Sequence, residues 1–331
     1  IDADVYIPNG FDISQKLSAT NAKYKKWNGE TIISELINNQ LISGQEVISS
    51  NSGENSGPDD MYYSYELDDN SQISLYTGGI NYRSKNYMEL SYSFYFDFYE
   101  NYFNNTLNEV FGTNDIDGLD KTEAKATTDK VLSLLDLSSM VGEPEIYSMT
   151  SDKVQAIREE TGATHDKYEN ELQQFTEQDD AYLIIYPVEY KGIPSSQVIA
   201  MGENELIECS KVFFIYSKSG LIGFEISGIF DEPEDAESSM IISPTDVCDR
   251  LKEFYSSIIV DAPINISMIK LVFINRRDYY TDDFLKCKVE PVWLIYGNQT
   301  IFKDGDKFNA EYILFINALT GETIPVLSIG G

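Results

Sequence analysis

The sequence predicts an α+β fold, in which helices are segregated from antiparallel hairpins. Three observations lead to this prediction: segments in which hydrophobic and polar residues alternate, helical stripes that each follow a capping residue, and short turn sequences that join successive strands. Alternation is typical of a strand with one buried face, and helices grouped apart from hairpins favour α+β over a parallel α/β sheet. A chain of 331 residues has room for about two domains.

Residues 1–119 form the first predicted unit, an N-terminal Tyr-rich α+β unit. The apolar residues of 32–37 predict a short amphipathic helix, and 61–67 and 72–77 predict two strands around a turn. The clearest strand is predicted at 88–99, where one residue in two is expected to face the core. These core-facing residues are Met88, Leu90, Tyr92, Phe94, Phe96 and Phe98.

Residues 120–236 form the second predicted unit, a helix-plus-sheet module. We expect Asp120 to cap a helix, with Glu123 as its capping-box partner. A second helical stretch is predicted to start near Ser151, to break at Gly162 and to continue through Phe175. The first helix has the predicted buried stripe Ala124, Thr128, Val131 and Leu135, and the predicted strands are 181–190, 211–217 and 221–230.

Residues 240–331 form the third predicted unit, a further helix-plus-sheet module. Ser243 has the character of an N-cap, Pro244 occupies the first helical position and Asp246 follows within the first turn. Asp304-Gly305 predicts a hairpin turn. The helix has the predicted stripe Val247, Leu251, Phe254 and Ile258, and strands are predicted at 264–275, 289–296 and 312–317.

The second and third units resemble each other. Their helical stripes share the spacing i, i+4, i+7, i+11, and their last hairpins align when 213–216 is matched with 314–317. In this alignment Ser219-Gly220 matches Thr320-Gly321. The sequence therefore predicts tandem modules, each a helix on an antiparallel sheet.

The charge of the chain excludes several classes of partner. Its 55 acidic and 24 basic residues give a formal net charge of −31, which repels phosphate backbones and anionic lipid. We therefore expect no nucleic-acid partner, and contact with a membrane only through a removed N-terminal anchor. The negative charge is explained for the most part by solubility. The more specific interpretation is that it attracts a basic protein or peptide.

The histidines and cysteines argue against common catalytic and metal sites. The chain has a single histidine, His165, and this count excludes a multi-histidine metal site. His165 lies in a polar stretch and is predicted to face solvent. Cys209, Cys248 and Cys287 are widely spaced, so buried free thiols are expected and at most one disulfide can form. The chain begins at Ile1 rather than Met, which fits a mature exported or lipid-anchored protein and equally a chain trimmed for expression.

No cofactor is expected, and calcium is the one ion that the sequence brings into consideration. Residues 114–120 place alternating oxygen ligands ahead of Gly118, as in half of a calcium loop. The glutamate that would complete such a loop is replaced by Ala124, so a capped turn leading into the helix is the preferred interpretation. Asp304 and Asp306 are likewise assigned to a hairpin turn.

Two stretches of the third unit carry a family resemblance. They are Glu290-Pro291-Val292-Trp293-Leu294-Ile295-Tyr296 and Phe315-Ile316-Asn317-Ala318-Leu319-Thr320-Gly321-Glu322. The third unit resembles a PepSY-type module, an extracytoplasmic α+β domain. The strands of such a module end in a motif like the second of these two stretches. The resemblance implies an exported binding or regulatory protein, similar to uncharacterised lipoproteins of gut Firmicutes.

The residues of that motif also have a purely structural interpretation. Gly321 is free to adopt a positive φ, and the side chains of Asn317 and Thr320 can bond to the local backbone. We therefore predict that Asn317, Thr320, Gly321 and Glu322 form a structural turn or contact a partner. The second unit has Ser217, Ser219 and Leu221 at aligned positions, which makes a shared ligand role doubtful.

The leading functional hypothesis is an exported, membrane-anchored binding or regulatory protein of the bacterial cell envelope, with a protein or peptide partner and no enzymatic activity. No nucleophile elbow, phosphate loop, dinucleotide fingerprint or zinc-protease motif is present in the sequence. The rival hypothesis is a carboxylate-based hydrolase of cell-wall or dietary glycan, which needs two nearby acids in an aromatic cleft. A spacer that holds something off the membrane is a third option.

Overall fold

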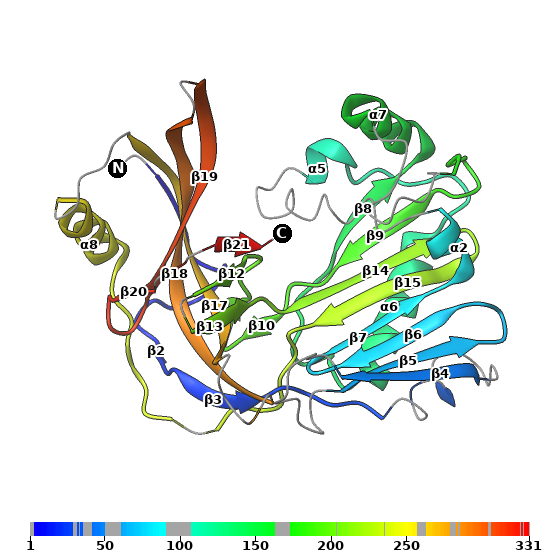
Figure 1. Cartoon of the computed structure of the whole chain (residues 1–331), viewed down its shortest axis with the longest axis horizontal. Coiled ribbons are helices and arrows are strands. Elements are labelled where there is room, and N and C mark those ends of the chain that lie inside the picture. The colour runs from blue at the N-terminus through cyan, green and yellow to red at the C-terminus, as the bar shows by residue number, and fades with distance from the viewer. Residues whose placement is uncertain are drawn as a thin grey trace.

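Two large β-sheets lie side by side in the computed structural model, and helices pack against both of them (Figure 1). The structure describes residues 3–28, 32, 34–35, 42–49, 61–90, 107–162, 173–202, 204–234, 236–256, 263–278, 283, 285–303, 306–324, 326 and 328–330. Among them, antiparallel strands far outnumber helices, and helices and hairpins are segregated. The predicted α+β class is therefore confirmed.

The eight-stranded sheet combines strands from the first and second sequence units. Every neighbouring pair in it is antiparallel. In spatial order the strands are β4 (Ile42–Ser49), β5 (Met61–Leu67), β6 (Gln72–Tyr76), β7 (Gly79–Arg83), β15 (Gly220–Ser227), β14 (Lys211–Ser217), β9 (Ala181–Ile185) and β8 (Glu145–Met149).

Helices cover both faces of the eight-stranded sheet. Helix α6 (Lys121–Leu134) packs on one face, where its Ala124 and Val131 join the core of β5–β7, β9, β14 and β15. The other face is covered by α2 (Lys85–Glu89), α5 (Leu107–Val110) and α7 (Ser151–Thr161). Because successive residues of β14 point to opposite faces, Phe214 contributes to the first core and Phe213 to the second.

The N-cap and the break predicted for the second unit are confirmed. The carboxylate of Asp120 accepts a hydrogen bond from the backbone N–H of Thr122 at 2.7 Å, and α6 starts at the next residue. Helix α7 ends at Gly162, whose left-handed φ of 62° is the conformation that glycine adopts without a Cβ clash. The predicted stripe of α6 is buried at all four positions, Ala124, Thr128, Val131 and Leu135.

The nine-stranded sheet draws on all three sequence units. Its path runs β20 (Thr323–Ile324), β19 (Asp306–Asn317), β18 (Lys286–Lys303), β17 (Ile264–Asp278), β13 (Glu205–Glu208), β12 (Ile199–Met201) and β21 (Ser328–Gly330). From the N-terminal region, β1 (Asp4–Tyr6) pairs with β17 in parallel and β3 (Thr20–Lys23) pairs with β18. Two small ribbons accompany it, β10 (Glu189–Tyr190) with β11 (Ile193–Pro194) and β16 (Ser239–Met240) with β2 (Lys16–Leu17). The sheets therefore do not follow the predicted unit boundaries near 119 and 236.

Helix α8 (Pro244–Ser256) packs on one face of the nine-stranded sheet. Ser243 and Asp246 form the reciprocal capping pair that starts it, because each side chain bonds to the other's backbone N–H. The indole of Trp293 is fully buried beneath the helix and donates its Nε1–H to the carbonyl of Ile242 at 3.2 Å. Val272, Ile274 and Phe315 form a separate core on the opposite face.

Three local predictions are wrong. Met88 and Glu89 belong to α2 rather than to a strand, because Ser84 caps a helix through the N–H of Tyr87 at 3.2 Å and Tyr87 and Leu90 are buried at helical spacing. Phe175 is buried but not helical. Phe254 is 36% exposed rather than part of a buried stripe.

Other elements were missed or lie outside the described residues. The strands that the sequence did not predict include β4, β7, β8, β12 and β13. Ile32 is helical as expected. The remainder of the predicted strand (91–99), His165, Ile258 and the Asp304-Gly305 turn lie outside the described residues, although Lys303 pairs with Asp306 on either side of that turn.

The predicted alignment of the second and third units does not agree with the faces of their sheets. It matches Phe213 with Leu314 and Ile215 with Ile316. Leu314 and Ile316 pack with α8, whereas Phe213 and Ile215 pack in the core of α7, on the face away from α6. Because neighbouring residues of a strand face opposite sides, this alignment would place α6 and α8 on opposite faces. The predicted matches of helices and of hairpins are therefore incompatible.

Truncation of a buried residue and of a partly exposed residue of α8 should lower the free energy of unfolding by different amounts. Leu251→Ala should lower the free energy of unfolding by about 2–5 kcal/mol, because Leu251 is fully buried against the sheet. Phe254→Ala on the same helix should lower it by less than about 1.5 kcal/mol, since its ring is partly solvated. Urea denaturation measures both. Equal losses would contradict this packing of α8.

Candidate functional site

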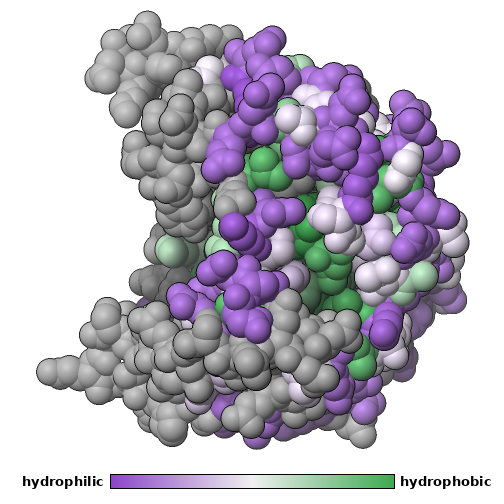
Figure 2. All heavy atoms as spheres, turned by 90° about the vertical axis from the view of Figure 1, so that its right-hand side faces the viewer, coloured by the Kyte–Doolittle hydropathy of each residue, from purple (hydrophilic) through white to green (hydrophobic). Residues whose placement is uncertain are grey.

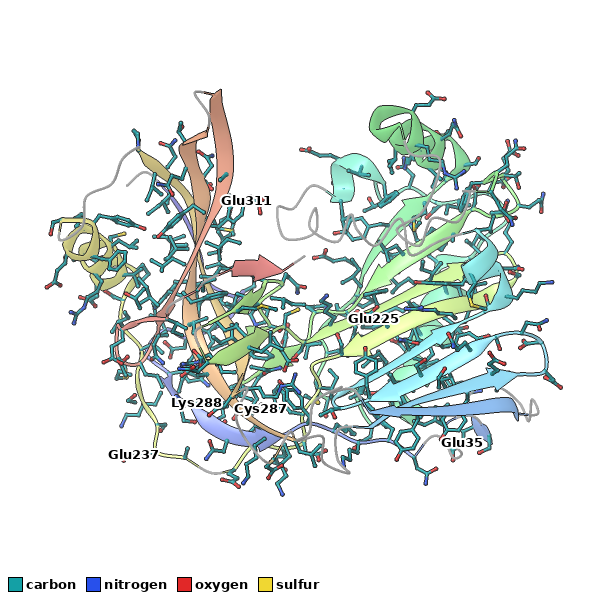
Figure 3. All side chains as sticks on the ribbon, in the orientation of Figure 1. Glu35, Glu225, Glu237, Cys287, Lys288 and Glu311 are labelled. Atoms are coloured by element: carbon teal, nitrogen blue, oxygen red, sulfur yellow. The ribbon has the colours of Figure 1, made fainter. Side chains whose placement is uncertain are left out.

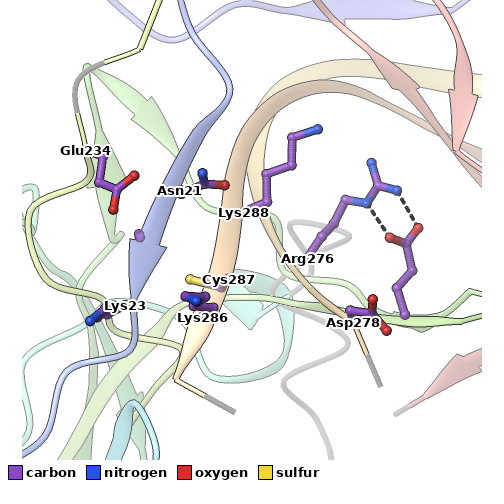
Figure 4. A pocket seen from close by; sticks show the side chains of 10 residues that line it. Asn21, Lys23, Glu234, Arg276, Asp278, Lys286, Cys287 and Lys288 are labelled. Atoms are coloured by element: carbon purple, nitrogen blue, oxygen red, sulfur yellow. Dashed lines mark hydrogen bonds and ion pairs between the residues drawn. The ribbon is translucent and has the colours of Figure 1, made fainter. Parts of the chain in front are cut away.

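A polar pocket of about 410 Å³ opens on the face of the sheet formed by β3, β18, β17 and β13 (Figure 4). The strands supply it because polar residues alternate with core residues along this part of the sheet. The segment that follows β15 completes the wall, since Glu234 donates its backbone N–H to the carbonyl of Asn21 at 2.9 Å. The pocket is lined by Asn21, Ala22, Lys23, Glu205, Glu234, Arg276, Asp278, Lys286, Cys287 and Lys288.

Strand register gathers basic side chains on this face. Lys23 of β3 lies directly opposite Lys286 of β18, and Asn21 lies opposite Lys288. On the other side of β18, Arg276 of β17 is the partner of Lys288. Directly opposed residues of a pair point to the same face, with Cβ atoms about 4.5–5.5 Å apart. The pairing therefore forms a row of four basic side chains in a chain that is acidic overall.

The guanidinium of Arg276 is held by two carboxylates. Its Nε and Nη2 donate to Glu205 at 2.8 and 2.6 Å, which is the bidentate geometry that suits arginine. Its Nη1 donates to Glu290. Burial alone would lower the pKa of Arg276, but the charges of Glu290 and Glu205 hold it above its ordinary value.

Glu290 is the buried anion of the site, with a side chain that is 0% exposed. Besides Arg276, it accepts from Lys288 Nζ at 3.0 Å and from Asn317 Nδ2 at 2.9 Å. An ionised carboxylate away from water is stable only when it is paired and hydrogen-bonded. Glu290 therefore ties the pocket to the end of β19, where Asn317 lies.

A second polar cluster occupies the opposite face of the same strands. The Tyr24 hydroxyl donates to Glu208, and Arg277 Nη2 reaches the same carboxylate at 3.3 Å. Burial and the charge of Glu208 raise the pKa of Tyr24 well above its ordinary value. Burial also raises the pKa of the Cys287 thiol to about 12, so this thiol is a poor nucleophile at neutral pH.

The four residues predicted from the motif form a turn at the end of β19. Asn317 Oδ1 accepts from the backbone N–H groups of Leu319 and Thr320 at 2.9 and 3.0 Å, and Gly321 has a φ of 74°. The hydroxyl of Thr320 accepts from the N–H of Glu322 at 3.2 Å. Asn317 alone also reaches the polar network, through Glu290, so the turn has the local bonding expected of a structural motif.

The other predicted residues do not join this site. In the calcium-like stretch, Asp115 pairs with Lys121 at 2.9 Å and Asp120 caps α6, so their oxygens serve other partners. Within the described ranges, no group of three or more His, Cys, Asp or Glu residues could hold a metal ion. Cys209, Cys248 and Cys287 are free thiols.

Sequence reasoning missed every charged residue of the pocket. Lys286, Lys288 and Glu290 stand at alternate positions of one strand, which is a usable signal of a polar face. Their partners Lys23, Glu205 and Arg276 come from distant parts of the chain, and only the sheet order brings them together.

Both carboxylate oxygens of Glu205 accept hydrogen bonds from Arg276, so this acid is held in an ion pair at the wall of the pocket. The rival hydrolase hypothesis needs an aromatic cleft. Among the described residues that line this pocket there is no aromatic side chain.

Comparison with known proteins gives a fold relationship without a function. No family model matches the chain, and no curated protein matches it. A solved crystal structure of an uncharacterized protein from Eubacterium rectale is similar, with a TM-score of 0.63 and 16% sequence identity. The match covers 98% of this chain and 90% of the other chain. At this identity the likeness establishes the fold alone.

Removal of Arg276 should destabilise the fold, because the buried Glu290 carboxylate then loses a partner. Arg276→Met should lower the free energy of unfolding by about 3–5 kcal/mol, because it removes the closest partner of a fully buried carboxylate. Arg250→Met, on an arginine whose side chain is 55% exposed, serves as the control and should change it by about 0.5 kcal/mol or less. Urea denaturation at pH 7 compares the two. Similar losses in both variants would contradict the role given to Arg276.

The Cys287 thiol should make the fold sensitive to alkaline pH. Its pKa rises from 9.0 to about 12 in the folded state, so above pH 9 the unfolded state releases a proton that the folded state keeps. The contribution of this thiol to the free energy of unfolding is therefore fully present below pH 9. It is lost as the pH rises toward 12, by at most about 1.4 kcal/mol per pH unit. Urea denaturation between pH 8 and 10 should show a shallower loss in Cys287→Ala. Parallel profiles would contradict the assignment.

Proposed function

We propose that this chain is an exported, non-enzymatic binding or regulatory protein of the bacterial cell envelope, with a protein or peptide partner. The observation that carries the proposal is the placement of its negative charge. Among the acidic residues that the structure describes, Asp180 and Glu290 are the buried ones. The other described carboxylates are therefore at least partly exposed to solvent.

The exposed acids are spread over the molecule rather than gathered into one site. Widely separated regions of the molecule contain the exposed residues Glu35, Glu237 and Glu311 (Figure 3). The pocket residues Lys288 and Cys287, by contrast, lie close together. Among the coloured residues of Figure 2, hydrophilic side chains surround a recessed strip of hydrophobic ones. A field of this kind steers a basic partner from a distance and weakens as salt screens it, over a Debye length of about 10 Å at 0.1 M ionic strength.

The chemistry of the described part of the chain also supports binding rather than catalysis. The pocket carboxylate Glu205 is engaged by an arginine, and the thiols of Cys209 and Cys287 are buried with raised pKa values of about 11 and about 12. Membrane attachment through an N-terminal anchor and the PepSY-like character of the third unit belong to the same proposal. Of the described helices, none has the length and apolarity needed to cross a bilayer.

A retention experiment tests the proposal. The protein is immobilised and exposed to solubilised envelope proteins of the source bacterium at about 0.05, 0.15 and 0.5 M salt, a range over which screening changes strongly. We expect one or a few basic proteins or peptides to be retained specifically, with several-fold weaker retention at the highest salt.

An unrelated globular protein of similar net charge is the control, because it separates specific recognition from simple ion exchange. Retention of nothing at any salt concentration would overturn the proposal. Retention of the same set by the control protein would overturn it as well.

A further inference from the structure

Strand β1 lies at an edge of the nine-stranded sheet, and its outer side is unpaired. It runs parallel to β17, with Asp4 opposite Met268 and Tyr6 opposite Lys270. In the part of the chain that the structure describes, β17 is the one strand that pairs with it. The other side of β1 therefore presents a short row of backbone N–H and C=O groups on which another strand can pair.

The side chains along this edge are exposed and apolar. Val5, Tyr6 and Ile7 are 44%, 49% and 36% exposed. Among the described residues, the other exposed large hydrophobic side chains stand singly in the sequence, and these three are consecutive. Single exposed apolar residues are ordinary on a protein surface, whereas a group of them on an open strand edge favours pairing with another chain.

Two other edge strands are better protected than β1. At β8, the backbone N–H of Ser148 donates to the carbonyl of Gly112 at 3.0 Å, and its hydroxyl donates to the carbonyl of Asn114. Strand β20 has two residues, and its Ile324 is buried. Covering an edge with a neighbouring segment and shortening it are both ways in which proteins prevent unwanted pairing. At β1 neither the apolar side chains nor the outer backbone groups are covered in this way.

One face of β1 continues the core beneath α8. Ala3 packs against that core, and Val5 points to the same face because it is two residues further along the strand. Ile269, which lies opposite Val5, is fully buried in the same core. An apolar side chain of a strand added beside β1 would therefore pack next to Val5 at the margin of an existing core.

The net charge of the chain indicates which kind of strand is attracted. The edge itself is balanced, since Asp4 lies on β1 and Lys270 lies opposite Tyr6. The whole chain has a net charge of −31, which repels a second copy of the same chain and attracts a basic segment. A strand of three residues offers few hydrogen bonds, each with a small net contribution, so this attraction is needed for binding.

We propose that β1 is the docking site of a basic, extended segment of the protein partner, which adds to the nine-stranded sheet as a further strand. This inference rests on the function proposed above, because it names the surface through which that partner binds. Backbone hydrogen bonds along residues 4–7 hold the segment, and Pro8, which has no N–H, ends the row. Contact with Val5 requires an apolar residue in the segment.

The test repeats the retention experiment at about 0.15 M salt with the full chain and two variants. Val5→Lys places a positive charge at the docking edge. Leu134→Lys is the matched control, because Leu134 is 38% exposed and lies on α6, which packs on the other sheet. Both substitutions add the same charge, so net charge does not distinguish them. Circular dichroism confirms that both variants are folded.

We expect Val5→Lys to retain the partner about tenfold more weakly than the wild-type protein, and Leu134→Lys to change retention by less than about twofold. Amide hydrogen exchange reports on the backbone itself. The outward N–H groups of residues 4–7 should exchange rapidly in the free protein and about tenfold more slowly in the complex with the retained partner.

The outcomes separate this inference from the function on which it rests. Retention of nothing by the wild-type protein overturns both. Specific retention that Val5→Lys leaves unchanged, or unchanged exchange at residues 4–7, overturns the docking site and leaves the proposed function standing. Analytical ultracentrifugation tests the remaining occupant. A dimer of the wild-type protein that Val5→Lys abolishes would also overturn the inference, because β1 would then bind a second copy of the chain.

Discussion

The carboxylate of Glu290 is the constraint around which the nine-stranded sheet is organised. It is fully buried, and its partners come from β17, β18 and the last residue of β19. Through Arg276 it is also linked to Glu205 on β13. A buried charge is tolerable only while its partners stay in place, so this residue fixes the relative positions of four chain segments. It also explains why a pocket lined with polar residues can lie so close to an apolar core.

The alternation of strands β17 and β18 divides their chemistry between two faces. Arg276 points to the pocket, whereas Arg277 points to Tyr24 and Glu208 on the reverse side. Further along β17, Phe273 enters the core of the eight-stranded sheet. The fully buried Asn275 bonds to the Ser210 hydroxyl at 3.1 Å and to the Gly228 carbonyl at 2.9 Å, next to β14 and β15. One strand thus serves the pocket, the core and the junction between the sheets.

Local features could be predicted from the sequence, and long-range ones could not. The caps at Asp120 and Ser243, the helix end at Gly162 and the strand Met61–Leu67 depend on neighbouring residues and appear where the pattern places them. The segment around Met88 was misassigned because a strand-like alternation competes there with the helical cap of Ser84. The pocket depends on pairing between the two ends of the chain, for which a single sequence carries no signal. The motif at Asn317–Glu322 was found because it is a local turn, and its link to the pocket through Glu290 was not visible.

The pairing of β1 with β17 and of β3 with β18 closes the nine-stranded sheet with strands from opposite ends of the chain. Such contacts give a fold a high contact order, and the entropy of closing so long a loop is lost before the pairing can stabilise anything. The sheet can therefore be completed only after almost the whole chain has been synthesised. Until then, β1 and β3 have no partner strand, and their edges stay open to other chains.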